Sequence, residues 1–311
     1  MSSTDTRVEK GAVADGIPCA FCGEIDRVND ALRRPVSFHG VIRRYTRCGN
    51  CGSRSLSPMP GNNELEALYT TDYFEGPGRD ELEMEIPNTE SWVLDNLPKG
   101  DGDLFVDLGC GDGNLLRLVA DHGYEVLGLD INEASVTTAR ITSGCPVLTL
   151  DELDSFLGQA SIVHLGDVLE HVPNPAEVLR GAITLLEPQG LLLAQGPLEA
   201  NRSLFNFVLA LVALLRKSAP VNDPPYHVHL VSPRGQEFFF QRFGFETLKY
   251  RLSDTSWPAP ATFDSSLLIN PRRFSLYLCR RFSSMIRPLA PRLLSNRFSY
   301  LGRYVPPEQR P

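Results

Sequence analysis

The sequence predicts an α/β protein whose main domain is a doubly wound, mostly parallel sheet, preceded by a small cysteine-bearing module. Three observations lead to this prediction. Strand-like apolar runs alternate with helical stretches between residues 104 and 195, and a glycine-rich turn at residues 109–113 follows the first run. Two C-x2-C pairs lie within residues 19–51. Alternating strands and helices are typical of a parallel sheet covered on both faces.

The composition is that of an ordinary globular protein. Of the 311 residues, 42% are hydrophobic and 22% are charged, which excludes a disordered or fibrous chain. The formal charge of −8 disfavours general nucleic-acid binding, which needs an excess of Lys and Arg. The longest apolar run, residues 204–215, is shorter than the roughly 20 residues that span a bilayer. Because the first residues also lack a secretory signal, we expect a cytoplasmic protein.

The two cysteine pairs predict a zinc-ribbon module over residues 1–60. Each tight C-x2-C turn can present two thiolates to one ion, so Cys19, Cys22, Cys48 and Cys51 would complete a tetrahedral site. A glycine follows each second cysteine and can adopt positive φ, and residues 36–45 alternate as a short hairpin would. Four protein ligands indicate a structural zinc, because a catalytic zinc keeps one position open. The alternative to a zinc site is that the two cysteine pairs are unrelated, either as redox pairs or as buried thiols.

The remaining elements follow in order. Residues 61–100 are predicted to form a helical linker or lid, with helices at 62–69 and 88–97. The main domain is predicted over residues 101–270. Its expected strands are 104–108, 125–130, 146–150, 161–166 and 190–195, and the expected helices are 114–122, 133–142, 152–157, 175–187 and 233–243.

The glycine-rich turn is the most informative motif. Gly109, Gly111 and Gly113 let the backbone turn sharply and approach a ligand closely, but their spacing differs from the G-x-G-x-x-G of dinucleotide-binding proteins. Asp107 precedes the turn, where it would repel a diphosphate and could hold a cationic group. Asp130 ends the next strand, where it can accept hydrogen bonds from ribose hydroxyls.

These motifs make residues 104–252 resemble the class I S-adenosylmethionine-dependent methyltransferases. The segment Leu165–Pro175, LGDVLEHVPNP, resembles the subgroup that contains ubiquinone-type O-methyltransferases. The resemblance implies a Rossmann-like, seven-stranded sheet with S-adenosyl-L-methionine as methyl donor. Within it, Asp107, Gly109, Gly111 and Gly113 match the family's first motif, Asp130 its ribose-binding acid, and Asp151 the acid that contacts the adenine amino group. The predicted cofactor site consists of these residues together with Cys110, Ile131, Asp167 and Tyr73. The alternatives are a dinucleotide dehydrogenase and an inert α/β domain.

A second, looser resemblance concerns the acceptor. The ribbon followed by residues 56–60 and 69–74 resembles a branch of zinc-ribbon-bearing methyltransferases that tailor sugars and natural products. This resemblance implies a biosynthetic role in which a sugar nucleotide or natural-product intermediate is methylated on oxygen or carbon.

Histidines are the candidates for removing the acceptor's proton, because their pKa lies near neutral pH. In the loop at residues 223–232, His229 is the first candidate for the general base and His227 the second. Tyr226 and Tyr73 could cover the methionine moiety or orient the acceptor, or they could simply pack. The alternative is that both histidines only cap or pack this loop. His171 is a further catalytic candidate: with Asp167 and Glu170 it could either hold a divalent cation or shape the cofactor pocket.

Residues 271–311 are predicted to be a basic C-terminal tail. They contain nine Arg and one acidic residue, Glu308. Pro288 and Pro291 should interrupt any helix there. We expect the tail to pack on the acidic core, with contact to anionic lipid or a carrier protein as the alternative.

Three functions remain open from the sequence. The first is a small-molecule methyltransferase. The second is an RNA base methyltransferase that uses the zinc module to bind its substrate. The acidic charge of the chain disfavours it, and Arg43, Arg44 and Arg47 in the ribbon favour it. The third is a non-catalytic adaptor, which the intact glycines, Asp107 and Asp130 oppose.

Overall fold

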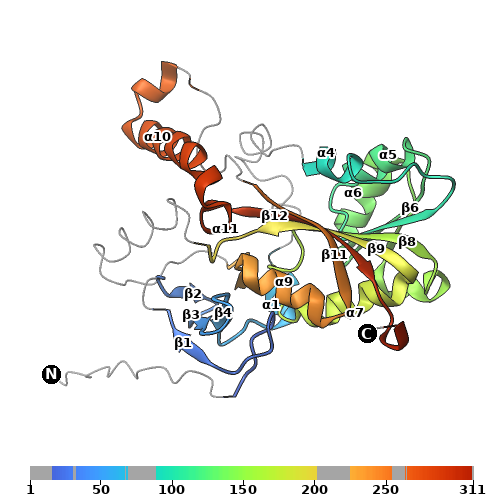
Figure 1. Cartoon of the computed structure of the whole chain (residues 1–311), viewed down its shortest axis with the longest axis horizontal. Helices are drawn as coiled ribbons and strands as arrows, with labels where there is room; N and C mark the ends of the chain where they lie inside the picture. The colour runs from blue at the N-terminus through green and yellow to red at the C-terminus, as the bar shows by residue number, and fades with distance from the viewer. Residues whose placement is uncertain are drawn as a thin grey trace.

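The structure is a computed structural model and describes residues 16–30, 33–66, 68, 89–201, 225–253, 263 and 265–309. Two sheets organise the described residues, a large one and a small one that lies beside it (Figure 1). The apolar run at 204–215 falls outside the described residues. In the parts that are described, none of the helices has both the length and the apolar character needed to cross a membrane.

The large sheet has seven strands in the order β11-β12-β9-β8-β5-β6-β7. Neighbouring strands from β7 to β9 are parallel, and β12 is antiparallel to both β9 and β11. This arrangement confirms the predicted seven-stranded, mostly parallel sheet. The strands are β5 (Leu104–Leu108), β6 (Glu125–Asp130), β7 (Val147–Thr149), β8 (Ala160–Gly166), β9 (Leu186–Pro197), β11 (Phe245–Ser253) and β12 (Arg297–Tyr304).

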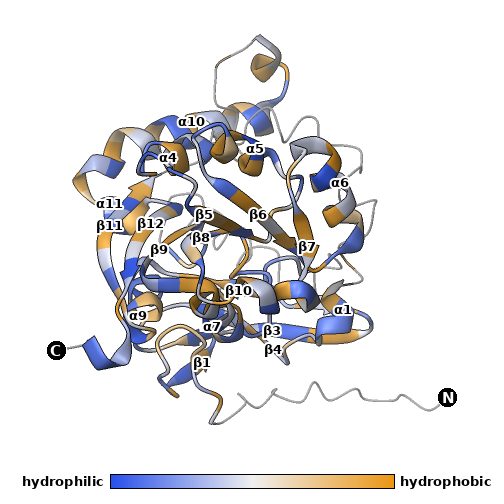
Figure 2. Cartoon of the chain, turned by 90° about the vertical axis from the view of Figure 1, so that its right-hand side faces the viewer, coloured by the Kyte–Doolittle hydropathy of each residue, from blue (hydrophilic) through white to orange (hydrophobic). Residues whose placement is uncertain are grey.

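Helices cover both faces of this sheet (Figures 1 and 2). Successive residues of a strand point to opposite faces, so Phe105 packs in one apolar cluster with α4 and α5, and Val106 packs in another with α7 and α9. The predicted helix at 152–157 is a 3-10 helix, Leu150–Phe156. The helices are α1 (Asn62–Glu66), α4 (Thr89–Leu94), α5 (Asn114–Ala120), α6 (Glu133–Ser143), α7 (Pro175–Leu185) and α9 (Pro233–Arg242).

The predicted domain boundary at residue 270 needs correction. After α10 (Pro271–Ile286) and α11 (Pro291–Leu294), the chain enters the large sheet as β12 between β9 and β11. The arginines dominate the composition of this region, but Phe298 and Tyr300 alternate with smaller residues and are 3% and 0% exposed. The ring of Tyr300 stacks on Phe240 of α9 with centroids 4.1 Å apart. The sequence after 270 is therefore partly core.

This placement predicts a large stability effect at a position inside the presumed tail. Replacing Tyr300 with alanine should lower the free energy of unfolding by about 3–5 kcal/mol, the range seen when a buried aromatic ring is removed. Denaturant unfolding of the purified protein measures the change, and Arg303→Ala on the same strand, whose side chain is exposed, serves as the control. Equal, small effects of the two substitutions would contradict a core position for β12.

The small sheet is built from residues of both predicted domains. It contains β1 (Arg27–Asn29), β2 (Val36–Phe38), β3 (Val41–Cys48) and β4 (Arg54–Ser57). Its last strand, β10 (His229–Leu230), comes from the main domain and pairs with β4. The predicted hairpin at 36–45 forms, with His39 and Gly40 at positive φ in its turn. The ribbon thus shares a sheet with the main domain.

Candidate cofactor and acceptor site

The glycine-rich turn connects β5 to α5, and each glycine has a positive φ. A Cβ on Gly109 would lie 2.5 Å from Val168, and one on Gly113 would lie 2.9 Å from the backbone oxygen of Ala139. A Cβ on Gly111 would meet nothing within 4 Å. Two of the glycines therefore allow close packing, and the third leaves the turn open toward a ligand.

Asp130 holds this turn in place from the end of β6. Its carboxylate accepts hydrogen bonds from the backbone N–H of Gly111 at 3.2 Å and of Asn132 at 3.0 Å. Burial raises the pKa of Asp130, and these backbone donors partly offset the rise. The next residue, Ile131, is 61% exposed. The carboxylate thus ties the glycine-rich turn to the end of β6.

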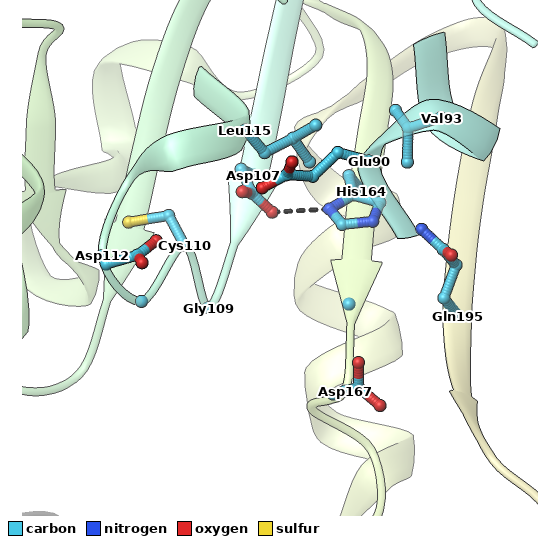
Figure 3. A pocket seen from close by; sticks show the side chains of 12 residues that line it. Glu90, Val93, Asp107, Gly109, Cys110, Asp112, Leu115, His164, Asp167 and Gln195 are labelled. Carbon is cyan, nitrogen blue, oxygen red and sulfur yellow. Dashed lines mark hydrogen bonds and ion pairs between the residues drawn. The ribbon is translucent and has the colours of Figure 1, made fainter. Parts of the chain in front are cut away.

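A cavity of about 290 Å³ opens at the carboxyl ends of β5 and β8 (Figure 3). Four of the residues that line it are acidic, and among the described residues none of the lining side chains is Lys or Arg. Such a cavity favours a ligand that carries positive charge. The lining consists of Glu90, Val93, Asp107, Gly109, Cys110, Gly111, Asp112, Leu115, His164, Gly166, Asp167 and Gln195.

Asp107 does not stand alone in this cavity. It is 3% exposed, and its Oδ1 lies 2.7 Å from Nδ1 of His164. The two residues are register partners on adjacent parallel strands. His164 was not among the predicted site residues, although a histidine inside the apolar strand run 161–166 is a signal that could have identified it. Glu90 and Gln195, which reach the cavity from α4 and β9, were not predicted either.

Some of the other residues predicted for the cofactor site line the cavity, and others are not described by the structure. Cys110 lines the cavity, and burial raises the pKa of its thiol. Asp151 lies in the 3-10 helix after β7, but its side chain is outside what the structure describes. Tyr73 also lies outside the described residues. Asp167 lines the cavity from the end of β8.

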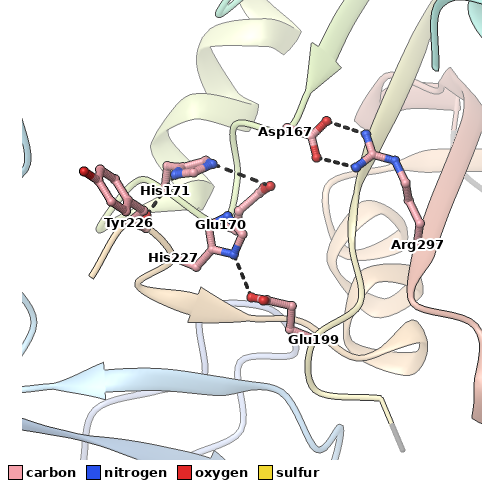
Figure 4. A network of polar contacts seen from close by, with 7 residues as sticks. All are labelled: Asp167, Glu170, His171, Glu199, Tyr226, His227 and Arg297. Carbon is pink, nitrogen blue, oxygen red and sulfur yellow. Dashed lines mark hydrogen bonds and ion pairs between the residues drawn. The ribbon is translucent and has the colours of Figure 1, made fainter. Parts of the chain in front are cut away.

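A second polar cluster begins at the same Asp167 (Figure 4). Asp167 has φ of 53° and forms a two-pronged ion pair with Arg297 of β12. Burial opposes ionisation of Asp167, but Arg297 outweighs it and lowers the pKa. Glu170, three residues later, is 3% exposed. Burial, reinforced by Asp167, raises the pKa of Glu170 to about 8.

The turn after β8 also fixes a pair of histidines. The backbone oxygen of Glu170 accepts hydrogen bonds from the N–H groups of Val228 and His229, which brings the segment before β10 against the turn. The rings of His171 and His227 then meet edge to face with centroids 4.6 Å apart. Nδ1 of His171 lies 2.8 Å from the backbone oxygen of Tyr226, to which it donates. Tyr226 itself is 36% exposed.

The pKa values of His171 and His227 are shifted in opposite directions. Burial, together with the nearby His227, lowers the pKa of His171 to about 4. Burial also opposes protonation of His227, but the carboxylate of Glu199, 2.7 Å from Nδ1, outweighs it and raises the pKa to about 9. At neutral pH His171 is neutral, whereas His227 is protonated and paired with Glu199. Nε2 of His227 is the ring nitrogen turned away from this pair.

The cluster could also hold a metal ion. Glu170, His171 and His227 each offer one ligand atom, and these atoms lie within 4.8 Å of one another. This set differs from the predicted Asp167, Glu170 and His171, because Asp167 is paired with Arg297.

His229, the first candidate for the base, lies in the interface between the two sheets. It is 1% exposed, its Nδ1 accepts from Ser55 of β4 at 2.8 Å, and its Nε2 faces the backbone oxygen of Pro173 at 3.3 Å. Burial lowers its pKa to about 4. A base must reach its substrate, and this ring packs against Phe21 instead. The expectation for His229 is therefore corrected: the residue joins the ribbon to the main domain.

The four predicted zinc ligands come together. Sγ of Cys19 lies 3.7 Å from that of Cys51, and Sγ of Cys22 lies 3.5 Å from that of Cys48. All four sulfurs lie within 4.8 Å of one another. A tetrahedral zinc with Zn–S bonds of about 2.3 Å requires sulfurs about 3.8 Å apart, so the cluster fits the ion.

The backbone around the cysteines repeats between the two turns. Gly23 and Gly52 have φ of 83° and 80°, and each donates its N–H to the carbonyl of the cysteine four residues earlier. The two cysteine pairs are thus built as equivalent halves of one site, as expected for a zinc ribbon.

The ribbon touches the acceptor side of the site directly. Tyr45 of β3 donates its hydroxyl to the backbone oxygen of His227 at 2.7 Å. Arg33 and Arg54 donate to the backbone oxygens of Glu199 and Ala200 at 2.9 and 3.0 Å. The ribbon therefore contacts the backbone of both members of the His227–Glu199 pair.

A family model described as a methyltransferase domain matches residues 89–250, just over half of the chain. The ubiquinone biosynthesis O-methyltransferase of Stutzerimonas stutzeri is 32% identical over 33% of this chain and 48% of its own length. That of Marinobacter nauticus is 34% identical over 36% of this chain and 50% of its own length. The chain spans about half the length of the curated relatives it matches.

A solved structure shares the fold. One chain of the complex that contains the Haloferax volcanii Trm112 methyltransferase activator superposes with a TM-score of 0.50 at 17% identity. The match covers 78% of this chain and 98% of that one.

Proposed function

This chain belongs to the methyltransferase-domain family, and on that premise we propose that it transfers a methyl group from S-adenosylmethionine to a hydroxyl of a small molecule. One observation carries the proposal. The turn from Asp167 to His171 starts in the wall of the acidic cavity and ends at the pair of histidines, so a donor site and a proton-accepting site adjoin.

The cavity suits the proposed methyl donor. S-adenosylmethionine supplies an electrophilic methyl group on a sulfonium, and its methionine end also carries an ammonium group. The acidic lining favours both cations. In this proposal the nucleoside lies along the glycine-rich turn, where Gly111 is not packed against other residues, and the carboxylate of Asp130 accepts hydrogen bonds from the ribose hydroxyls.

His227 is the general base in this proposal. Its Nδ1 is held by Glu199, so Nε2 is left to take the acceptor's proton as the methyl group moves. The edge contact with His171 and the Tyr45 bond to its backbone position the ring. Tyr226, whose side chain is exposed beside the cluster, orients the acceptor.

The acceptor class follows from the ribbon and the relatives together. The curated relatives are O-methyltransferases by name, which supports transfer to oxygen. The zinc-ribbon branch that the sequence resembles supports a sugar nucleotide or natural-product intermediate. In this proposal the zinc held by Cys19, Cys22, Cys48 and Cys51 is structural, because four protein ligands leave no open position.

The methyl-donor site is tested by titration with S-adenosylhomocysteine. Wild-type protein should bind it, and Asp130→Ala should weaken binding by about 1–3 kcal/mol, the cost of losing a buried or charged hydrogen bond. Isothermal calorimetry measures both, with Asp121→Ala on an exposed position after α5 as the control. Wild-type protein that binds no S-adenosylhomocysteine would refute the proposed function.

The base is tested by the pH dependence of turnover. With the pKa of His227 raised to about 9, kcat should rise with pH until it levels near that value, because only the deprotonated ring accepts a proton. In Glu199→Gln the group that raises this pKa is gone, so the rising limb should move by a unit or more toward the ordinary histidine value of about 6.5. An unmoved limb in this variant would remove the His227–Glu199 pair from the mechanism.

A further inference from the structure

We infer that His164 binds the α-carboxylate of the methionine end of S-adenosylmethionine and takes up a proton as it does so. Asp107, its neighbour, then binds the α-ammonium. This inference rests on the proposed function and goes beyond it, because it assigns a positioning role to a residue in the interior of β8 that the glycine-rich motif does not contain.

The first support is a buried nitrogen that lacks a partner. His164 is 5% exposed and lines the cavity. Its Nδ1 is engaged by Asp107, but within the described part of the chain its buried Nε2 has no hydrogen-bond partner. Leaving a buried polar group of this kind unsatisfied carries a free-energy cost. A ligand group that pairs with Nε2 recovers this cost.

The second support is the direction in which the two ring nitrogens of His164 point. The two nitrogens of an imidazole point to opposite sides of the ring, so one ligand group cannot bind both Asp107 and Nε2. Figure 3 shows Asp107 on one side of the ring and Gln195 on the other. The methionine end offers two groups on one carbon, an ammonium and a carboxylate. Asp107 attracts the ammonium, which leaves the carboxylate for His164.

The third support is charge. The described lining contains the carboxylates of Glu90, Asp107, Asp112 and Asp167. An anionic ligand group entering this cavity needs a donor that can become positive, and His164 is the lining side chain with that chemistry. Gln195, also in the lining, can add only a neutral donor.

The proton uptake follows from the bond to Asp107. The carboxylate of Asp107 accepts the hydrogen on Nδ1, so Nε2 becomes a donor only when the ring carries a second proton. Phe105 lies against the ring with centroids 6.2 Å apart and has no charge. The titratable groups that face the site are Asp107 from β5, Cys110 and Asp112 from the glycine-rich turn, Glu90 from α4 and Asp167 after β8.

Calorimetry with two ligands tests the inference. S-adenosylhomocysteine has the methionine end, whereas 5′-methylthioadenosine has the same nucleoside and thioether without it. His164→Leu should weaken binding of S-adenosylhomocysteine by about 10- to 100-fold, as expected for a charge-assisted hydrogen bond, and leave binding of 5′-methylthioadenosine unchanged. The second ligand also reports whether the variant is folded.

Proton uptake is measured by repeating the titrations at about pH 8 in buffers of different ionisation enthalpy. Wild-type protein should take up about one proton per S-adenosylhomocysteine and none with 5′-methylthioadenosine. His164→Gln, which keeps a donor near Nε2, should retain much of the affinity without the uptake.

The outcomes separate the two proposals. Wild-type protein that binds neither ligand would refute the proposed function. Wild-type protein that binds both, with equal effects of His164→Leu on the two ligands or with no proton uptake, would leave the function standing and overturn the role of His164.

Discussion

Replacing His227 with asparagine is expected to lower kcat by about 10²- to 10⁴-fold, the range that a positioned general base contributes. The asparagine amide can occupy the place of Nδ1 and keep the contact with Glu199, but it has no atom in the place of Nε2. Affinity for S-adenosylhomocysteine should not change, because His227 is not among the residues that line the cofactor cavity. Steady-state turnover and calorimetry on the same preparation separate the two effects.

His122→Asn is the matched control, because this histidine is exposed after α5 and distant in sequence from the cluster. It should turn over like the wild type. The assignment of the base would be wrong if His227→Asn retained wild-type kcat across the pH range. A variant that lost cofactor affinity together with turnover would indicate a structural role instead.

Replacing Cys48 with serine is expected to release the zinc and unfold the ribbon. Structural zinc contributes on the order of 10–16 kcal/mol of apparent binding free energy in small modules, and the ribbon is too small to replace this from its core. Phe21 would lose its buried position against Phe239. Metal analysis should find about one zinc per chain in the wild type and none in the variant, and thermal unfolding should show an early transition.

The same substitution should also lower turnover, because Tyr45 and Arg33 hold the backbone of the His227–Glu199 pair from the ribbon. Cys279→Ser, in α10 and outside the cluster, is the control and should keep zinc, stability and turnover. Absence of zinc from wild-type protein purified without chelators would refute the metal site.

Features that depend on neighbours in the chain could be predicted from the sequence. The predicted bounds of the strands at 104–108 and 125–130 are the observed ones, because a short apolar run between turn residues, in a chain that alternates strands and helices, predicts a buried strand. Gly23 and Gly52 take the predicted positive φ, since each C-x2-C-G turn is a local structure. The fold family followed from the glycine-rich turn, which carries its geometry within a few residues.

Features that depend on distant pairing could not be predicted. β12 pairs with β9, which lies about a hundred residues earlier in the chain. Because the segment is rich in arginine, its buried aromatic residues were not predicted to be part of the core. The spacing of His229 suggested an acceptor loop, but its two-residue strand pairs with β4 of the ribbon and buries the ring. The pairing of Asp107 with His164 depends on the register between two parallel strands, which neither strand specifies alone.

The position of β12 bears on how the protein is made. During synthesis β9 and β11 are made well before β12, yet β12 lies between them in the folded sheet. Until it arrives, the nascent chain exposes the long hydrogen-bonding edge of β9, and such edges recruit other strands. A chain that ends within α10 would therefore lack the strand that covers this edge, and we expect it to aggregate.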